Sequence, residues 1–234
     1  MGQGLSDRDL AHQLGEELKY ELAEESDQLP EFLQDFKKSG KFTIQDAPGK
    51  DEVHLTRSFG NEKITVSFSI SDINEAQESQ QMDADLESLE KELQEENPEA
   101  AARVRSDLNE YAEDEALDTF PVEIQVAVEK AGSGVLKFDA LCESGEILIS
   151  SVIHYGDAAT ATADTAEANW KRRGMYVGPQ FGQLEEDLQT KFEGYLEERG
   201  IDTGLAMFIP LYIEYKEQNE YVSWLKNVKS FVEA

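Results

Sequence analysis

The feature that most limits how this chain can fold is an alternation of apolar and polar residues in its central part. Residues 53–59 and 64–70 alternate in this way, and the pair Gly60-Asn61 separates the two runs. Alternation on both sides of a Gly-Asn pair predicts a β-hairpin. Strands covered on both faces would be apolar at nearly every position, so the pattern indicates antiparallel strands with one buried face.

Further runs of the same kind extend the predicted sheet. The strand-like runs lie at residues 41–47, 53–59, 64–70, 122–128, 136–142 and 147–151, with a short candidate at residues 175–177. Turn-forming residues separate neighbouring runs, for example at 131–134 and 144–145. We therefore expect a meander of about seven antiparallel strands.

Helical patterns precede and follow the strand-like runs in the sequence. Ser6 can cap an N-terminal amphipathic helix that has a leucine at every fourth position. The pair Leu29-Pro30 is expected to interrupt this helix. Two helices are predicted at the C-terminal end: the first ends at Arg199-Gly200, and the second begins at Asp202 and contains Pro210, which should kink or divide it.

Apolar residues at helical spacing are candidates for packing between helices or between subunits. In the N-terminal helix they are Leu10, Leu14, Leu18 and Leu22, and in the last helix they are Tyr221, Trp224, Leu225, Val228 and Phe231. Such stripes pack into the core of one subunit or form an oligomer contact, and both interpretations stay open.

The charge of the chain limits its partners. It has 50 acidic and 21 basic residues among 234, a formal net charge of -29 at pH 7. Nucleic acids and anionic membranes bind proteins through many Lys and Arg side chains, so direct binding to either is not expected. No apolar stretch approaches the roughly 20 residues that cross a bilayer, so no membrane insertion is expected. Basic proteins and cations are the expected partners.

Negative charge is densest between about residues 72 and 118. This segment contains roughly half of the negative surplus and almost no aromatic residues. The acids expected to bind partners are Asp83, Asp85, Glu87, Glu90, Glu92, Glu95 and Glu96. With 39% hydrophobic residues, the chain is expected to form one domain over residues 1–234, in which this segment is a flexible acidic insertion.

The sequence contains no recognisable catalytic, cofactor or metal motif. Its three histidines lie far apart, and neither a Cys-x-x-Cys nor a His-Glu-x-x-His spacing occurs. Gly132-Ser133-Gly134 lies between two strand-like runs and is interpreted as a hairpin turn. Cys142 is the only cysteine and is expected to be a buried thiol in a strand. We therefore predict a protein that is not an enzyme and has no cofactor, catalytic site or caged metal site.

Five segments carry a family resemblance. They are Gly60-Asn61-Glu62-Lys63-Ile64-Thr65-Val66, Tyr176-Val177-Gly178-Pro179, LEEDLQ at 184–189, YLEERGI at 195–201 and EQNEYVSWLKNVKSF at 217–231. Together they resemble the mitochondrial acidic matrix protein family, also called the mitochondrial glycoprotein family. Its animal member is the receptor for the globular heads of a complement subcomponent. The resemblance spans essentially the whole chain.

This resemblance implies an α+β fold and a particular assembly. The implied fold is a twisted antiparallel sheet of about seven strands, flanked by one N-terminal and two C-terminal helices. The implied assembly is a doughnut-shaped homotrimer with an acidic face and channel. The resemblance also implies a protein of the mitochondrial matrix without enzymatic activity, acting as a chaperone or adaptor linked to mitochondrial translation, ribosome biogenesis and oxidative phosphorylation.

The leading hypothesis from the sequence is a non-enzymatic acidic scaffold that binds basic matrix proteins, including ribosomal or RNA-binding proteins, by electrostatic complementarity. The acidic insertion would supply charge, while the leucine stripe and the C-terminal aromatic helix would hold the subunits together. Two alternatives stay open. One is a divalent-cation (Ca²⁺) buffer, and the other is a regulatory cofactor of an RNA-binding protein in mitochondrial RNA processing.

Overall fold

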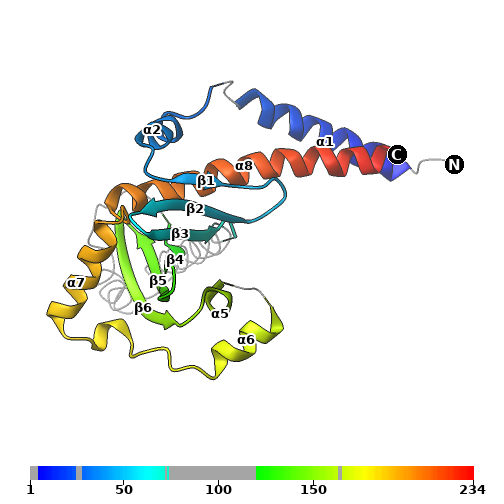
Figure 1. Cartoon of the computed structure of the whole chain (residues 1–234). Helices are drawn as coiled ribbons and strands as arrows, with labels where there is room; N and C mark the ends of the chain where they lie inside the picture. The colour runs from blue at the N-terminus through cyan, green and yellow to red at the C-terminus, as the bar shows by residue number, and fades with distance from the viewer. Residues whose placement is uncertain (1–4, 25–27, 72, 74–119, 163–164) are drawn as a thin grey trace, which may run out of the picture.

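A computed structural model of the chain describes residues 5–24, 28–71, 73, 120–162 and 165–234 (Figure 1). In this part of the chain six antiparallel strands form one sheet in the order β1-β2-β3-β4-β5-β6, so each strand pairs with its neighbour in sequence. The strands are β1 (Thr43–Gln45), β2 (Glu52–Phe59), β3 (Glu62–Ser69), β4 (Val122–Lys130), β5 (Gly134–Glu143) and β6 (Glu146–Tyr155). The predicted α+β class and the antiparallel meander are confirmed.

The hairpin predicted at Gly60-Asn61 forms as expected. Phe59 pairs with Glu62, which leaves a two-residue loop between β2 and β3. Gly60 adopts a φ of 60°, in the left-handed region that two-residue hairpin loops require and that glycine adopts without steric cost. The turn residues therefore set the register that turns Leu55 and Val66 to the same buried face.

Helices precede and follow the sheet. They are α1 (Leu5–Glu24), α2 (Glu31–Ser39), α5 (Ala158–Thr162), α6 (Ala166–Arg173), the 3-10 helix η1 (Phe181–Gln183), α7 (Glu186–Glu197) and α8 (Thr203–Glu233). Pro30 is the residue before α2, so the predicted interruption of the N-terminal helix is confirmed. Asp202 caps α8 as predicted, because its side chain accepts a hydrogen bond from the Leu205 N–H at 3.1 Å.

Residues 175–177 differ from the sequence-based expectation. They do not form a strand, and the sheet contains six strands in the described part of the chain rather than about seven. Tyr176 is 85% exposed and Val177 is 46% exposed. Met175 packs against the cluster that contains Val135 and Tyr155, but Tyr176 and Val177 have no such surface to cover. β-propensity alone does not build a strand from them.

Pro210 does not divide the last helix, which is continuous from Thr203 to Glu233. Proline inside a helix removes one backbone hydrogen bond and costs about 3 kcal/mol. Its neighbours Ile209 and Ile213 are both fully buried. Burying side chains of this size contributes about 1.5–3 kcal/mol each, which offsets the cost of the proline.

One face of the sheet carries the core. Phe138 and the valines of β2, β3 and β4 pack there with Leu33 of α2, Leu196 of α7 and Ile209 of α8. The opposite face is mainly polar, except near the ends of β5 and β6, where Val135, Ile153 and Tyr155 pack against Ala161 of α5. Helices α2, α7 and α8 thus pack on one face of the sheet and α5 on the other, and α8 continues beyond the sheet (Figure 1).

A buried ionic cluster joins the end of α7 to the sheet. Arg199 donates two hydrogen bonds to the Glu62 carboxylate, from Nε at 2.7 Å and from Nη2 at 2.9 Å. Lys130 Nζ lies 2.9 Å from the same carboxylate. The hydrogen bond from Arg199 is the main reason that the pKa of Glu62 lies below its ordinary value, while burial acts in the opposite direction and Lys130 adds to the lowering.

The chain leaves α7 through a left-handed residue. Gly200 has a φ of 82°. The Ile201 N–H donates to the Leu196 carbonyl and the Gly200 N–H donates to the Glu197 carbonyl, the two bonds of a Schellman motif. This confirms the predicted end of the helix. It also places Arg199 so that its side chain reaches Glu62 rather than solvent.

Candidate functional site

The candidate site is the helical hairpin formed by α1 and the C-terminal part of α8. The two helices run antiparallel, and the start of α1 and the end of α8 lie together at the tip of the hairpin (Figure 1). Gln218 Nε2 donates to Glu21 Oε2 at 2.7 Å, and the Tyr221 hydroxyl donates to Glu17 Oε1 at 3.4 Å. We refer to α1 and residues 214–233 together as the α1–α8 hairpin.

The predicted leucine stripe of α1 is divided between buried and exposed positions. Leu14 is buried and Leu18 is half-buried, whereas Leu10 is 49% exposed and Leu22 is 41% exposed. Residues four apart on an α-helix are rotated by about 40°, so a stripe of four leucines turns by about 120° from first to last. Only its middle can face α8, which leaves the two outer leucines uncovered in the monomer.

The predicted apolar residues of α8 divide in the same way. Leu225 is 2% exposed and Val228 is half-buried. Tyr221 stacks on Trp224 with ring centroids 6.1 Å apart and an interplanar angle of 13°. Trp224 is nevertheless 55% exposed, and Phe231 is 83% exposed. Exposed aromatic side chains of this size are typical of protein interaction surfaces.

Exposed carboxylates lie on the same two helices as these apolar side chains. Asp7, Asp9 and Glu16 are exposed on α1, and Glu214 is exposed on α8. Two neighbouring carboxylates of the hairpin affect each other. The pKa of Glu217 lies above its ordinary value, mainly because this side chain is partly buried and also because the negative Glu21 carboxylate is close to it. A surface that combines carboxylates with exposed aromatic rings suits a partner that offers cations beside apolar groups.

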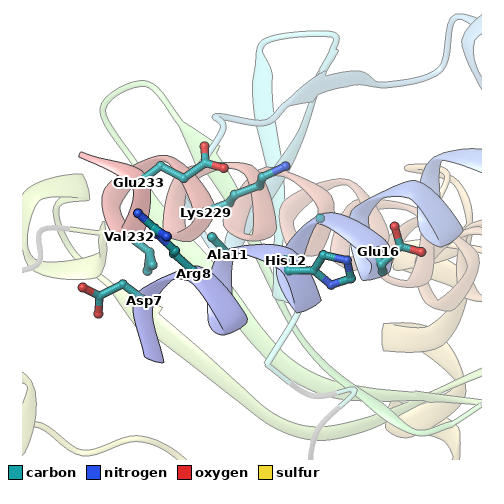
Figure 2. Close-up of a pocket in the computed structure, with 9 residues that line it drawn as sticks. Asp7, Arg8, Ala11, His12, Glu16, Lys229, Val232 and Glu233 are labelled. Atoms are coloured by element: carbon teal, nitrogen blue, oxygen red, sulfur yellow. The ribbon is translucent and has the colours of Figure 1, made fainter. Parts of the chain in front are cut away.

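A polar cavity of about 430 Å³ lies between the two helices at the tip of the hairpin. Figure 2 shows its lining side chains, which come from both helices and carry both signs of charge: Asp7, Arg8, Ala11, His12, Glu16, Lys229, Val232 and Glu233. Gly15 also lines it, and a Cβ there would lie 3.0 Å from Lys229 Nζ, so the glycine leaves space for the lysine. Mixed charge around an open cavity does not select one ligand.

The acids predicted to bind partners lie outside the described residues. They are Asp83, Asp85, Glu87, Glu90, Glu92, Glu95 and Glu96, and their role stays a prediction.

The described residues also bear on the other expected chemistry. Burial raises the pKa of the Cys142 thiol to about 12, so this side chain is not a nucleophile at neutral pH. In the described ranges no group of three or more His, Cys, Asp or Glu side chains is placed to hold a metal ion. Among the same residues, no helix is both long and apolar enough to cross a membrane.

Sequence reasoning missed the charged residues that fix α8 to the sheet. Lys216 is buried, with Nζ 2.7 Å from Asp46 Oδ1 and 2.9 Å from Glu220 Oε1. Glu220 in turn accepts hydrogen bonds from the Gly49 N–H at 3.0 and 2.9 Å. The segment between β1 and β2 is thereby attached to α8. No local signal reveals such pairs, because their members lie far apart in the chain.

The meander, the helices that pack on it and the acidic hairpin define a class of acidic α+β protein. Residues 14–232 match the mitochondrial glycoprotein family, MAM33. The chain belongs to this family.

Two curated relatives support the assignment. The chain is 34% identical over 199 residues to the mitochondrial acidic protein mam33 of Schizosaccharomyces pombe, a match that covers 82% of this chain and 68% of the relative. It is 29% identical over 194 residues to an uncharacterized mitochondrial protein of Arabidopsis thaliana, covering 82% of this chain and 62% of that one. The matches therefore span about two thirds of the length of these relatives. Both relatives are named as mitochondrial proteins, and neither name indicates a catalytic activity.

Two solved structures share the fold. One is a Leishmania major protein described as a sequence homologue of human p32, with a TM-score of 0.66, 25% identity, and coverage of 97% of this chain and 99% of that one. The other is the Trypanosoma brucei p22 protein, with a TM-score of 0.67, 24% identity, and coverage of 98% and 100%. The likeness confirms the fold class.

Proposed function

We propose that this protein is a non-enzymatic acidic scaffold of the mitochondrial matrix, a chaperone-like adaptor that binds basic proteins. In this role it supports mitochondrial translation, ribosome biogenesis and oxidative phosphorylation. The observation that carries the proposal is the negative charge: the chain has a net charge of -29, and carboxylates are exposed along the α1–α8 hairpin, among them Asp9, Glu16 and Glu214.

The charge acts mainly on how quickly and how selectively partners are bound. Complementary charge raises association rates and rejects partners of the wrong sign, while a few buried aromatic anchors carry much of the binding free energy. Basic ribosomal and RNA-binding proteins offer the complementary sign. Nucleic acid itself would be repelled, so any effect on RNA would pass through such a partner.

The exposed apolar residues of the hairpin support a homotrimer. Leu14 and Leu225 are already buried within one chain, so Leu10, Trp224 and Phe231 are the side chains that a neighbouring subunit would cover. Trp224→Ser combined with Phe231→Ser should therefore shift the sedimentation of the protein from a trimer to smaller species. Unchanged sedimentation of this double variant would contradict this contact.

The test of partner binding compares two variants of equal charge. In the first, Asp83, Asp85, Glu87, Glu90 and Glu92 become the corresponding amides. In the second, the amides replace Glu143, Glu146, Glu186, Glu193 and Glu197, which are exposed. Each variant changes the formal net charge from -29 to -24.

Both variants are then used, beside the wild type, to capture proteins from mitochondrial matrix extract. We expect the first variant to lose basic partners and the second to retain them. Equal loss in both would mean that total charge, rather than the insertion, selects partners. No loss in either would contradict the electrostatic proposal.

A further inference from the structure

A second cavity, beside the start of β1, is lined by cationic side chains, although the protein as a whole is acidic. It has a volume of about 610 Å³, and Lys41, Arg57 and Lys63 line it. Its other lining residues are glycine and four hydroxyl-bearing residues, Ser39, Thr43, Thr56 and Ser58. In the described part of the chain no carboxylate lines it, although the 50 acids outnumber the 21 bases in the sequence. We call this the basic cavity.

Arg57 is held in place before any ligand arrives. Its guanidinium carbon lies 5.7 Å from the ring centroid of Phe42 and 5.5 Å from that of Phe59. Its Nη1 donates to the Arg199 carbonyl at 2.7 Å. A guanidinium has five N–H donors, and among the described residues Arg57 forms no ion pair with a carboxylate. A half-buried, oriented cation of this kind binds an anion with little loss of side-chain freedom.

The two lysines contribute unequally. Lys63 is exposed and forms no ion pair with any carboxylate that the structure describes. Lys41 Nζ lies 3.0 Å from Asp202 Oδ2, so part of its charge is already compensated. Arg57 and Lys63 therefore supply most of the uncompensated positive charge at the basic cavity. Arg57 pairs with the buried Ile64 and lies on the core face of the sheet, and Lys63 lies on the opposite face, so the two cations flank the cavity from the two sides of the sheet.

An apolar cavity of about 350 Å³ adjoins the basic cavity and shares Ser39 and Lys41 with it. Aromatic and aliphatic side chains from α2 and α8 form most of its lining, including Phe36, Phe208 and Leu211, and Asp202, the carboxylate paired with Lys41, also lines it. The pair of cavities thus offers cations and hydroxyls at one end and an apolar surface at the other. Sites with this division of lining are typical of small-molecule ligands.

We propose that the two cavities together bind a small organic phosphate, with its phosphate group in the basic cavity and its apolar body between α2 and α8. Arginine matches phosphate oxygens with paired N–H donors, and hydroxyls supply further hydrogen bonds. Charges more than about 8–10 Å away are largely screened at physiological salt. The acidic surface therefore repels a long polyanion along its length but leaves a small anion to the local cations. This function is separate from the binding of basic proteins.

The test uses 1-naphthyl phosphate as the probe, with inorganic phosphate and 1-naphthol as partial probes, in calorimetry on the full chain. We expect the ester to bind more tightly than either partial probe. Arg57→Gln should weaken its binding about 10- to 100-fold, the effect of losing hydrogen bonds to a charged group. Lys63→Gln should weaken it about fivefold. Lys191→Gln removes an exposed lysine of α7 and should leave binding unchanged.

Three results would overturn the proposal. The first is no binding of the ester to the wild type at about 1 mM, a Kd at which a ligand gains only about 4 kcal/mol. The second is inorganic phosphate binding as tightly as the ester, which would remove the role of the apolar cavity. The third is unchanged binding of the ester by the Lys63→Gln variant. Because Lys63 is exposed, this variant should fold, so the test holds even if Arg57→Gln does not fold.

Discussion

Replacing Glu62 by glutamine should destabilise the fold far more than the same replacement at Glu146. Both residues are the first of a strand, β3 and β6 respectively. Glu146 is exposed, whereas the side chain of Glu62 is 5% exposed and accepts contacts from Arg199 and Lys130 at 2.7, 2.9 and 2.9 Å.

The magnitude follows from what the amide leaves behind. A glutamine keeps one oxygen and turns an N–H group toward two cations. Arg199 then loses its buried counter-charge and keeps only the exposed Glu198 carboxylate at 3.9 Å. Removing one partner of a buried ion pair costs about 3–5 kcal/mol. For a chain of this length each kcal/mol changes Tm by about 2–4 °C, so Glu62→Gln should lower Tm by about 6–20 °C. Glu146→Gln should stay within about 0.5 kcal/mol of the wild type.

The assay is urea and thermal unfolding of both variants at one fixed protein concentration, because assembly makes apparent stability depend on concentration.

The pKa of Glu62 is lowered in the folded state. Its contribution is therefore present above the pKa of about 4.3 that an unfolded Glu has, and is lost as the pH falls through the lower folded value. The difference between wild type and Glu62→Gln should shrink in that acid range. Equal stability of the two variants at pH 7 would refute the reasoning.

Three further predictions concern single sites. Leu225→Ala removes a side chain that is 2% exposed and should cost about 2–5 kcal/mol in urea unfolding, whereas Lys226→Ala, at an exposed position, should change stability by less than about 0.5 kcal/mol. Gly200→Ala places a Cβ against the Arg57 guanidinium at a φ of 82° and should cost about 1–3 kcal/mol, measured in the same way. The Cys142 thiol, whose pKa burial raises to about 12, should react with a thiol reagent only after unfolding, as followed by mass spectrometry.

Local patterns predicted the strands and helices because each carries its own signal. Gly60-Asn61 indicates a two-residue hairpin loop wherever it separates alternating runs, and Asp202 indicates a helix start from its side chain alone. The same reasoning failed at residues 175–177, since a short apolar run says nothing about whether a surface is available to cover it.

Contacts between distant segments could not be predicted in this way. Glu62 and Arg199 are 137 positions apart. Glu62 is in phase with the buried Ile64 and Val66 of β3, so the alternation indicates a charge on the apolar face, but it does not identify the partner of that charge. Arg57 likewise occupies a position in phase with the buried Val53 and Leu55 of β2. The pattern does not show that it lies between two aromatic rings, one from β2 and one from the segment before β1. The apolar residues of the hairpin were predicted as a group, but which of them stay exposed depends on the drift of the leucine stripe around α1.

The most direct test of the electrostatic account is the salt dependence of binding to one purified basic matrix protein recovered in the capture experiment. The Debye length falls from about 10 Å at 0.1 M salt to about 3 Å at 1 M. We predict that the association rate falls steeply and the Kd rises over this range, because complementary charge steers the encounter. A Kd and an association rate that do not change with salt would contradict the account and assign partner selection to an apolar surface instead.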